Sequence, residues 1–145
     1  MIALIQRVSS ARVVVDGQIR AEIAAGLLAL IGVERLDGAA QGTRLLERLL
    51  DYRVFADTAG RMNRSLRDTA GGLLLVPQFT LAADTSSGNR PGFSAAAEPA
   101  RARALFEQLR AAATAAHQPV AAGEFGAHME VTLTNDGPVT FWLKA

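Results

Sequence analysis

The fold of this chain is decided by Ala11–Ile23, the stretch ARVVVDGQIRAEI. Two runs with β-branched residues, Ala11–Val15 and Gln18–Ile23, flank the dipeptide Asp16-Gly17. An Asp-Gly pair between two such runs is a strong signal for a hairpin with a two-residue turn. The stretch therefore predicts an antiparallel pair of strands near the start of the chain.

Further strands are predicted on both sides of this hairpin. Met1–Val8 has strand composition from its first residue, and Gly26–Val33 is a continuous apolar run, which is typical of a fully buried strand. Gly72–Leu81 is a second buried run, whereas Met129–Thr134 alternates between apolar and polar residues. We expect the last strand at Val139–Leu143.

Two helices and one long loop are predicted between these strands. The leucines of Ala39–Tyr52 recur at helical spacing, and Glu98–Ala116 has a proline in its first turn. Arg53–Phe55 is expected to form a short strand, and the polar segment Ala82–Ser94 reads as an exposed loop. Together the elements predict a mixed α/β fold in a single domain over residues 1–145, with two helices packed on layered β-sheets.

Composition excludes several classes of protein. Lys and Arg number 15 against 14 Asp and Glu, so the net charge of +1 gives no general attraction to nucleic acid. The chain has no cysteine, which rules out disulfides, thiolate nucleophiles and zinc–thiolate sites. No cluster of His, Asp or Glu has ligand spacing, so we expect no metal and no cofactor. No signal peptide or membrane-spanning run is recognised, so we expect a cytoplasmic protein with no membrane partner.

The most informative motif is Asn135-Asp136-Gly137-Pro138-Val139-Thr140, near the end of the chain. Proline fixes φ and has no N–H, so it interrupts a ladder of strand hydrogen bonds. An X-Pro bond is also the one peptide bond in which the cis form is accessible at low cost. A cis bond here would turn two successive carbonyl oxygens the same way and form a rigid pair of acceptors. The alternative is an ordinary tight turn between two strands.

A second polar motif is Pro77-Gln78-Phe79-Thr80. We expect Gln78 and Thr80 to share one face of a strand, because they are two residues apart. Pro77 cannot donate to a ladder, so the neighbouring strand should be interrupted or absent there. This would leave backbone groups near Gln78 and Phe79 free for a ligand. The alternative is that Gln78 and Thr80 are simply solvated on an edge strand.

With both motifs present, the chain resembles the D-aminoacyl-tRNA deacylase family, which hydrolyses the ester between a D-amino acid and tRNA. The resemblance runs nearly from end to end and is most specific in the two motifs. The framework that carries the rest of it comprises Met1–Val8, Gly26–Leu28, Tyr52–Phe55, Asp57, Gly60, Met62, Asn63, Leu81–Asp84, Asn89–Pro91, Gly123–Ala127, Met129 and Phe141. The resemblance implies a three-layer fold of two β layers and one helical layer, and an enzyme without a cofactor.

The resemblance also implies a homodimer in which the Gly-Pro segment of each subunit enters the pocket of the other. Gly137 and a cis-Pro138 would present their carbonyls to the α-amino group of the substrate, and Arg7 would help to hold the segment. An L-amino acid would be rejected because its side chain has no space, which is selection by exclusion. Glycine has no side chain to exclude, so activity on mischarged glycyl-tRNA is implied as well.

The site residues follow from the same resemblance. The catalytic residues would be Gln78, Phe79 and Thr80, and the substrate-binding residues would be Gly137, Pro138, Arg7, Met129, Phe125, Asn135, Val139 and Thr140. The family usually has serine where this chain has Pro77, and often serine where it has Gly92. The N–H of Phe79, which would bind the ester carbonyl, is unaffected by the first change.

No base is recognised beside Thr80, although a hydrolase usually pairs its nucleophile with one. We therefore expect the 2′-OH of the terminal ribose to help activate water, while backbone N–H groups stabilise the oxyanion and Thr80 orients substrate or water. His117 and His128 lie outside both motifs and are expected to be surface or structural residues.

Other assignments stay open between two roles. Phe125 and Met129 would either line an adenine pocket or belong to the core. Arg61, Arg64 and Arg67 would either touch tRNA phosphates or form a solvated face.

Three other functions stay open at this point. A related editing deacylase with a trans Gly-Pro bond and relaxed selectivity for L-alanine would be distinguished by the proline geometry. A non-catalytic protein that binds the tRNA 3′ end would bind without turnover. An esterase that depends on Thr80 would cleave small D-amino acid esters without tRNA.

Overall fold

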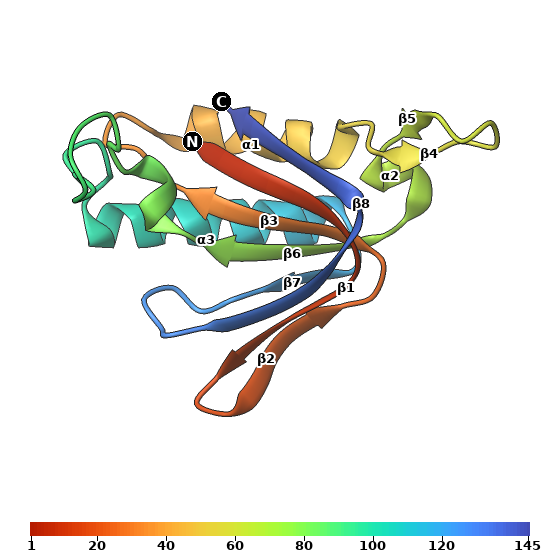
Figure 1. The fold of residues 1–145 in the computed structure, drawn as a ribbon, viewed down its shortest axis with the longest axis horizontal. Coiled ribbons are helices and arrows are strands. Elements are labelled where there is room, and N and C mark those ends of the chain that lie inside the picture. The colour runs from red at the N-terminus through yellow and green to blue at the C-terminus, as the bar shows by residue number, and fades with distance from the viewer.

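The protein is built around one strongly bent β-sheet (Figure 1). In the computed structural model, which describes residues 1–145, the strand order is β2-β1-β3-β6-β7, and β8 pairs with the other edge of β1. Parallel pairing joins β3 to β6 and β6 to β7, while the pairs formed by β1 are antiparallel. The strands of this sheet are β1 (Ile2–Val15), β2 (Gln18–Ile23), β3 (Gly26–Gly32), β6 (Gly72–Pro77), β7 (Val120–Ala122) and β8 (Glu130–Lys144).

The predicted hairpin between β1 and β2 is confirmed. Val15 pairs with Gln18, and the two residues between them have positive φ, +51° at Asp16 and +73° at Gly17. This is the conformation that a two-residue hairpin turn of the primed type requires, and Asp and Gly adopt it at low cost.

Two pairs of predicted strands are single strands in the structure. Apart from Met1, the predicted strands Met1–Val8 and Ala11–Val15 both lie in β1. Apart from Met129, the predicted strands Met129–Thr134 and Val139–Leu143 both lie in β8. The alternative of an ordinary tight turn at Gly-Pro is therefore wrong, because the chain bulges there and continues in the same strand. Both long strands bend, so that their two halves lie in different layers of the molecule (Figure 1).

Two hydrophobic clusters separate the layers. Leu73 and Leu75 of β6 point into the larger cluster, which lies between the sheet and the helices, whereas Leu74 and Val76 point into the smaller one. The smaller cluster lies under the far half of β1 and under β2. Side chains alternate across a strand, so a strand buried on both faces reads as a continuous apolar run. The predicted three-layer arrangement is confirmed.

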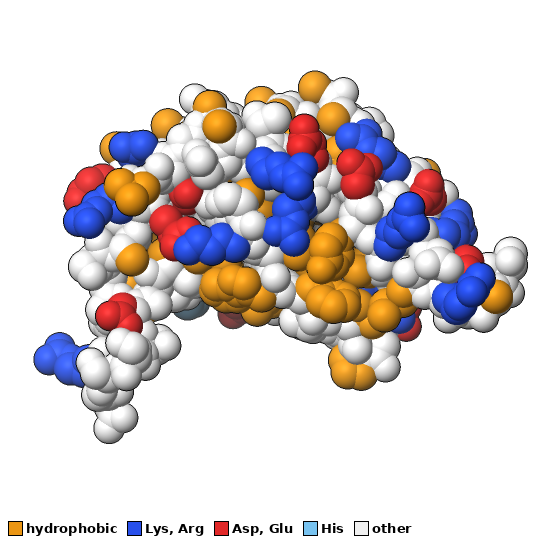
Figure 2. All heavy atoms as spheres, turned by 90° about the horizontal axis from the view of Figure 1, so that it is seen from above, with side chains coloured by type: hydrophobic (Ala, Val, Ile, Leu, Met, Phe, Trp, Pro, Cys, Tyr) orange, Lys and Arg blue, Asp and Glu red, His pale blue; other side chains and the backbone are white.

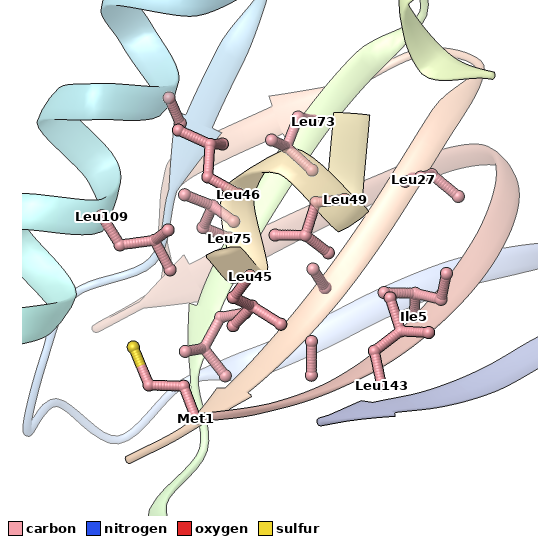
Figure 3. Packing of buried hydrophobic residues seen from close by; sticks show 14 of the residues in the cluster. Met1, Ile5, Leu27, Leu45, Leu46, Leu49, Leu73, Leu75, Leu109 and Leu143 are labelled. Atoms are coloured by element: carbon pink, nitrogen blue, oxygen red, sulfur yellow. The ribbon is translucent and has the colours of Figure 1, made fainter. Parts of the chain in front are cut away.

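Both predicted helices are present and pack on the same face of the sheet. They are α1 (Ala39–Asp51) and α3 (Pro99–Ala116), and Figure 3 shows Leu45 and Leu49 of α1 pointing into the cluster that Leu109 of α3 closes. The short strand expected at Arg53–Phe55 is present as β4 (Phe55–Ala56), shifted by two residues at its start and one at its end. The sequence did not predict β7 or the other short elements, which are β5 (Met62–Arg64), the one-turn helix α2 (Leu66–Thr69) and the 3₁₀ turn η1 (Phe79–Ala82). No helix is both long and apolar enough to cross a membrane.

Candidate functional site

The Gly-Pro motif forms a bulge in β8. Asn135 pairs with Val8 on one side of it, and Thr140 pairs with Gln6 on the other. The pairing thus advances five residues along β8 but only two along β1, and the surplus residues leave the ladder. The Gly137–Pro138 peptide bond within the bulge is cis.

Arg7 ties this bulge to the body of the protein. Its Nε donates to the backbone oxygen of Asp136 at 2.9 Å, and its Nη1 donates to the backbone oxygen of Val54 at 2.6 Å. The guanidinium also lies 3.4 Å from the carboxylate of Asp136. The side chain of Arg7 is only 16% exposed, and its bond to Val54 is partly buried. Two backbone segments far apart in sequence are therefore joined through one planar cation.

Asn135 closes the base of the bulge. Its Oδ1 accepts from the N–H of Val139 at 2.7 Å, and its Nδ2 donates to Thr140 Oγ1 at 3.0 Å. The same hydroxyl also accepts from Gln6 Nε2 at 3.3 Å. The polar groups of three predicted substrate-binding residues, Asn135, Val139 and Thr140, are thus engaged with one another.

Gly137 occupies a position that only glycine fits. Its φ is +149°, and a Cβ built there would lie 2.6 Å from Cγ2 of Val139 and 2.8 Å from its backbone nitrogen. No side chain donates to the carbonyl oxygen of Gly137 or Pro138, and both residues are exposed. The bulge therefore offers two rigidly mounted acceptors to the surroundings.

The second motif differs from its prediction. Strand β6 ends at Pro77, and Gln78 leads into the η1 turn, where Leu81 donates to the Gln78 oxygen at 3.2 Å. Gln78 and Thr80 therefore do not share a strand face. The expectation of an interrupted neighbour is confirmed, since β7 pairs with β6 only as far as Leu75. Without a strand on that side, the chain satisfies its backbone groups by turning.

The turn brings the three predicted catalytic residues together. Gln78 Nε2 donates to Thr80 Oγ1 at 2.5 Å. The N–H of Gln78 is not free as predicted, because it donates to the Ile31 oxygen at 2.7 Å. Phe79 is the first residue of the turn, so no carbonyl of the turn can accept its N–H, and no loop or side-chain bond uses it.

An aromatic pair that the sequence did not predict covers this turn. The ring of Phe79 is 58% exposed and lies 5.0 Å from the ring of Phe93, which is 40% exposed. Two backbone bonds of 2.7 and 2.9 Å between Asp84 and Gly92 close the loop that separates the two rings. This loop projects as an arm from the molecule (Figure 2). The one signal for the pair was the position of Phe93, two residues after the Asn89–Pro91 motif.

The carboxylates of Asp57 and Asp84 have lowered pKa values. The side-chain bond from Asn63 is the main cause at Asp57, which follows β4 and also accepts from two backbone N–H groups. Ser86 lowers the pKa of Asp84 in the loop. Both are fixed acceptors that organise their turns.

The two motifs lie at opposite ends of the sheet. The bulge lies opposite Arg7, which is level with Leu27 of β3 and Leu73 of β6, whereas Gln78 follows the far end of β6. Along the strands, the two motifs are five residues apart, at about 3.3 Å per residue. Across the sheet, from β8 to β6, they are three strand spacings apart, at about 4.8 Å each. The two motifs are therefore separated by roughly 20 Å. Neither of two open surface pockets, of about 370 and 240 Å³, is lined by a residue of either motif.

Phe125 and Met129 lie on different faces of the sheet. Phe125 contacts the larger cluster, where its ring is 6.3 Å from that of Phe106 and 5.1 Å from the guanidinium of Arg103. Met129 packs on the smaller cluster, and its sulfur lies 2.7 Å from where a Cβ of Gly123 would be. That position is also 3.6 Å from the Pro77 ring, so Met129 and Pro77 both lie beside Gly123.

The three arginines considered for tRNA have local partners. Arg61 lies 3.6 Å from the carboxylate of Asp57, Arg64 donates to the Asp68 oxygen, and Arg67 donates to Asp51 at 2.9 Å. Each side chain is exposed.

The two histidines are not close to either motif in the sequence, and one has a structural contact. His117 caps α3 and its ring lies 2.7 Å from the Gly71 oxygen, which is the structural role expected of it. His128 is exposed. No group of three His, Asp or Glu side chains is placed to hold a metal.

Comparison with known proteins decides the family. The model of the D-Tyr-tRNA(Tyr) deacylase family matches residues 4–144. The chain belongs to this family. A D-aminoacyl-tRNA deacylase of Xanthomonas euvesicatoria is 66% identical over 145 residues, and one of Thioalkalivibrio sulfidiphilus is 65% identical over 144; the matches cover 99% of this chain and 99% and 97% of those proteins.

Solved structures share the fold of this chain. A c-Myc DNA unwinding element binding protein superposes with a TM-score of 0.95 at 32% identity, covering 100% of this chain and 99% of that one. A probable eukaryotic D-amino acid tRNA deacylase gives a TM-score of 0.88 at 14% identity over 99% and 98%, which shows the shared fold. The predicted family, fold and hydrolase class are confirmed.

Proposed function

We propose that this deacylase hydrolyses D-aminoacyl-tRNA, and also mischarged glycyl-tRNA, in a site that two copies of the chain build together. Family membership supports the reaction, and the separation of the two motifs supports the shared site. Acceptors roughly 20 Å from the catalytic turn cannot contact the same small substrate within one subunit. In a twofold dimer, each Gly-Pro bulge would reach the turn of the partner, so that two equivalent sites form.

Exposed aromatic side chains support association of two copies. Phe141 and Trp142 of β8 are 36% and 52% exposed, and they lie along the sheet between the levels of the two motifs. Phe79 and Phe93 add a second exposed pair beside the turn. Figure 2 shows hydrophobic side chains gathered along one edge of the molecule. Large apolar groups of this kind mark protein interfaces more often than free surface.

The proposed selection of chirality depends on the acceptors of the bulge. The carbonyls of Gly137 and Pro138 accept the α-ammonium group, and the walls of the pocket leave no space for the side chain of an L-amino acid. Because Gly137 has no side chain, the backbone itself can approach the substrate closely. Selection by exclusion also accounts for activity on glycyl-tRNA.

The proposed chemistry uses the turn as an electrostatic device. The N–H of Phe79 stabilises the oxyanion of the tetrahedral intermediate, and such a donor contributes roughly 3–4 kcal/mol. Thr80 Oγ1 already accepts from Gln78, so its own proton is free to donate to water or substrate. An amide donor is not a base, so Thr80 is not activated as a nucleophile. The 2′-OH of the terminal adenosine therefore helps to activate the attacking water.

The remaining assignments complete the proposal. Met129 contacts the terminal adenosine, and Phe125 supports the pocket from the other face of the sheet, while Arg7 and the bulge residues Asn135, Val139 and Thr140 shape the pocket. The chain acts as one catalytic domain over residues 1–145 in the cytoplasm, with tRNA and a second copy as its partners.

The first experiment compares deacylation of D-tyrosyl-tRNA and L-tyrosyl-tRNA by the purified protein. We expect rapid loss of the D ester and far slower loss of the L ester. Glycyl-tRNA should be cleaved in the same assay. Binding of D-tyrosyl-tRNA without turnover would contradict the proposal and would identify a protein that only binds the tRNA end.

Subunit complementation tests the shared site. Gly137→Ala damages the bulge, and Phe79→Pro removes the N–H donor at a helical position that tolerates proline. Each variant alone should be inactive. In a re-associated equal mixture, about half of the dimers contain one chain of each variant, and one of the two sites in such a dimer is intact. The mixture should therefore regain about a quarter of the wild-type activity. Phe79→Ala controls for loss of the ring. No recovery in a mixture that exchanges subunits would place both motifs of a site in one chain.

A further inference from the structure

We propose that Asn135 is a positioning residue that fixes the direction of the Pro138 carbonyl and thereby sets the selectivity for D-amino acids. This inference rests on the proposed function, in which that carbonyl receives the substrate. Its basis is the hydrogen bond of 2.7 Å from the Val139 N–H to Asn135 Oδ1.

The Pro138 carbonyl and the Val139 N–H belong to the same peptide unit. A peptide unit is planar, and in the trans form its C=O and N–H point in opposite directions. Fixing the N–H of Val139 therefore fixes the carbonyl of Pro138. The Pro138–Val139 bond is trans, since the only cis bonds of the chain precede Pro119 and Pro138. The amide of Asn135 thus points this carbonyl away from the base of the bulge.

No other group of the chain is placed to do this. The ladder between β1 and β8 is interrupted between Asn135 and Thr140, so no strand partner holds the peptide units of the bulge. Arg7 binds the oxygen of Asp136, which lies two peptide units before the Pro138 carbonyl. The bulge is therefore held at two points, and Asn135 holds the one next to the second acceptor.

The amide of Asn135 is itself held in one orientation. Its Nδ2 donates to Thr140 Oγ1 at 3.0 Å and lies 3.4 Å from the Val139 oxygen, while Gln6 supports the same hydroxyl. Two donor contacts on the nitrogen side leave Oδ1 facing the Val139 N–H. The pattern fits a fixed support for the carbonyl, because the oxygen and the nitrogen of the Asn135 amide are both engaged within β8.

The test measures kcat/KM for D-tyrosyl-tRNA and for L-tyrosyl-tRNA with variants of Asn135. Asn135→Ala removes the acceptor, and we expect the D-to-L ratio to fall by about tenfold or more, the effect of one well-placed hydrogen bond. Asn135→Asp keeps an acceptor oxygen for Val139 and should stay within about threefold of the wild-type ratio. Thr134→Ala, one residue earlier on β8 and exposed, is the matched control and should not change the ratio.

The outcomes separate this inference from its alternatives. If Asn135→Ala lowers kcat/KM for D-tyrosyl-tRNA and the thermal stability but leaves the ratio unchanged, Asn135 only stabilises the fold and the inference is wrong. A wild-type protein that does not cleave D-tyrosyl-tRNA overturns the proposed function instead. If Asn135→Ala does not fold, Thr140→Val removes only the hydroxyl that orients the amide. We expect it to lower the ratio by about threefold, and an unchanged ratio would again reject the inference.

Discussion

The two ends of the sheet differ in how their motifs are held. At the Gly-Pro bulge, Arg7 holds the backbone from the neighbouring strand β1 and ties it to Val54, and Asn135 holds it from within β8. At the catalytic turn, the one side-chain bond joins Gln78 to its near neighbour Thr80, and the Phe79 ring lies largely in solvent against Phe93. The conformation of the bulge is thus fixed by contacts within the chain, whereas the catalytic turn is exposed at the surface.

This difference indicates a division of labour between the two motifs. A device that rejects a substrate by shape has to be rigid before the substrate arrives, and the bulge meets that requirement. A surface turn with exposed rings is instead completed by what covers it, which in our proposal is the second subunit and the tRNA end. The predictions below test this contrast, beginning with the largest expected effect.

Gly137→Ala should disrupt the rigid end most strongly. The new Cβ would lie 2.6 Å from the Val139 side chain and 2.8 Å from its backbone nitrogen, so the bulge has to move. Displacement of a positioning group by about 1 Å can lower the rate about 100-fold, and we expect at least that loss of kcat/KM for D-tyrosyl-tRNA. Gly60→Ala is the control, because Gly60 also has positive φ but no atom within 4 Å of the new Cβ. Equal loss in both variants would show that backbone strain alone is responsible.

The open end should depend on the substrate more than on its own hydroxyl. With D-tyrosyl-tRNA that ends in 2′-deoxyadenosine, we expect the enzymatic rate, corrected for spontaneous hydrolysis, to fall by about 100-fold or more, as for the loss of a general base. Thr80→Ala should lose less than about tenfold with normal substrate, the effect of one hydrogen bond. Single-turnover rates of both reactions give the comparison. If the 2′-deoxy substrate reacted at the normal rate and Thr80→Ala were inactive, the proposal would be wrong and Thr80 would be identified as the nucleophile.

The sequence predicted the hairpin and the long helices better than the turn that follows β6. The hairpin at Asp16-Gly17 and both long helices follow from local patterns, because turn conformation and helical periodicity are properties of neighbouring residues. The strand expected to reach Leu81 instead ends at Pro77, because β7 stops at Ala122 and no ladder is available beyond it. Strand length depends on a distant partner, which a local pattern cannot reveal.

The candidate site shows the same limit. The two motifs could be recognised from residue types and from the family resemblance, and Gly137 could be singled out from its proline neighbour. The partner of Arg7 at Val54 and the contact of Phe93 with Phe79 depend on the fold, since 47 residues separate the first pair and the second closes around an exposed loop. The position of the two motifs at opposite ends of the sheet could not be predicted from the sequence either, because it depends on how the strands pair.

Phe93→Ala measures how much the aromatic pair supports the open end. An aromatic pair contributes about 0.5–1.5 kcal/mol beyond its buried area, so we expect a fall of about 1 kcal/mol in the free energy of unfolding and a decrease of a few fold in kcat. Urea denaturation and steady-state kinetics give the two values. Ile19→Ala is the control, because Ile19 is 54% exposed in the β1–β2 hairpin, outside both motifs. If both variants behave alike, the ring of Phe93 does not support the turn.

The smallest expected effect is on two carboxylates, one near each motif. Asp57 and Asp84 should both titrate below the ordinary pKa of 3.8, Asp57 mainly through Asn63 and Asp84 mainly through Ser86. A lowered pKa means that the ionised carboxylate is more stable in the folded protein than in the unfolded chain. Each contribution to stability is therefore present above pH 3.8 and is lost as the pH falls through the pKa of the folded state.

Asn63→Ala separates these two carboxylates. It removes the main hydrogen bond to Asp57, so the pKa of Asp57 should rise toward its ordinary value, while that of Asp84 should stay the same because its donors are at the other end of the sheet. Titration of the side-chain carboxyl resonances by NMR measures both groups in one sample. A parallel rise at Asp84 would mean that the two ends are coupled, and it would contradict the independence on which the contrast between the bulge and the turn depends.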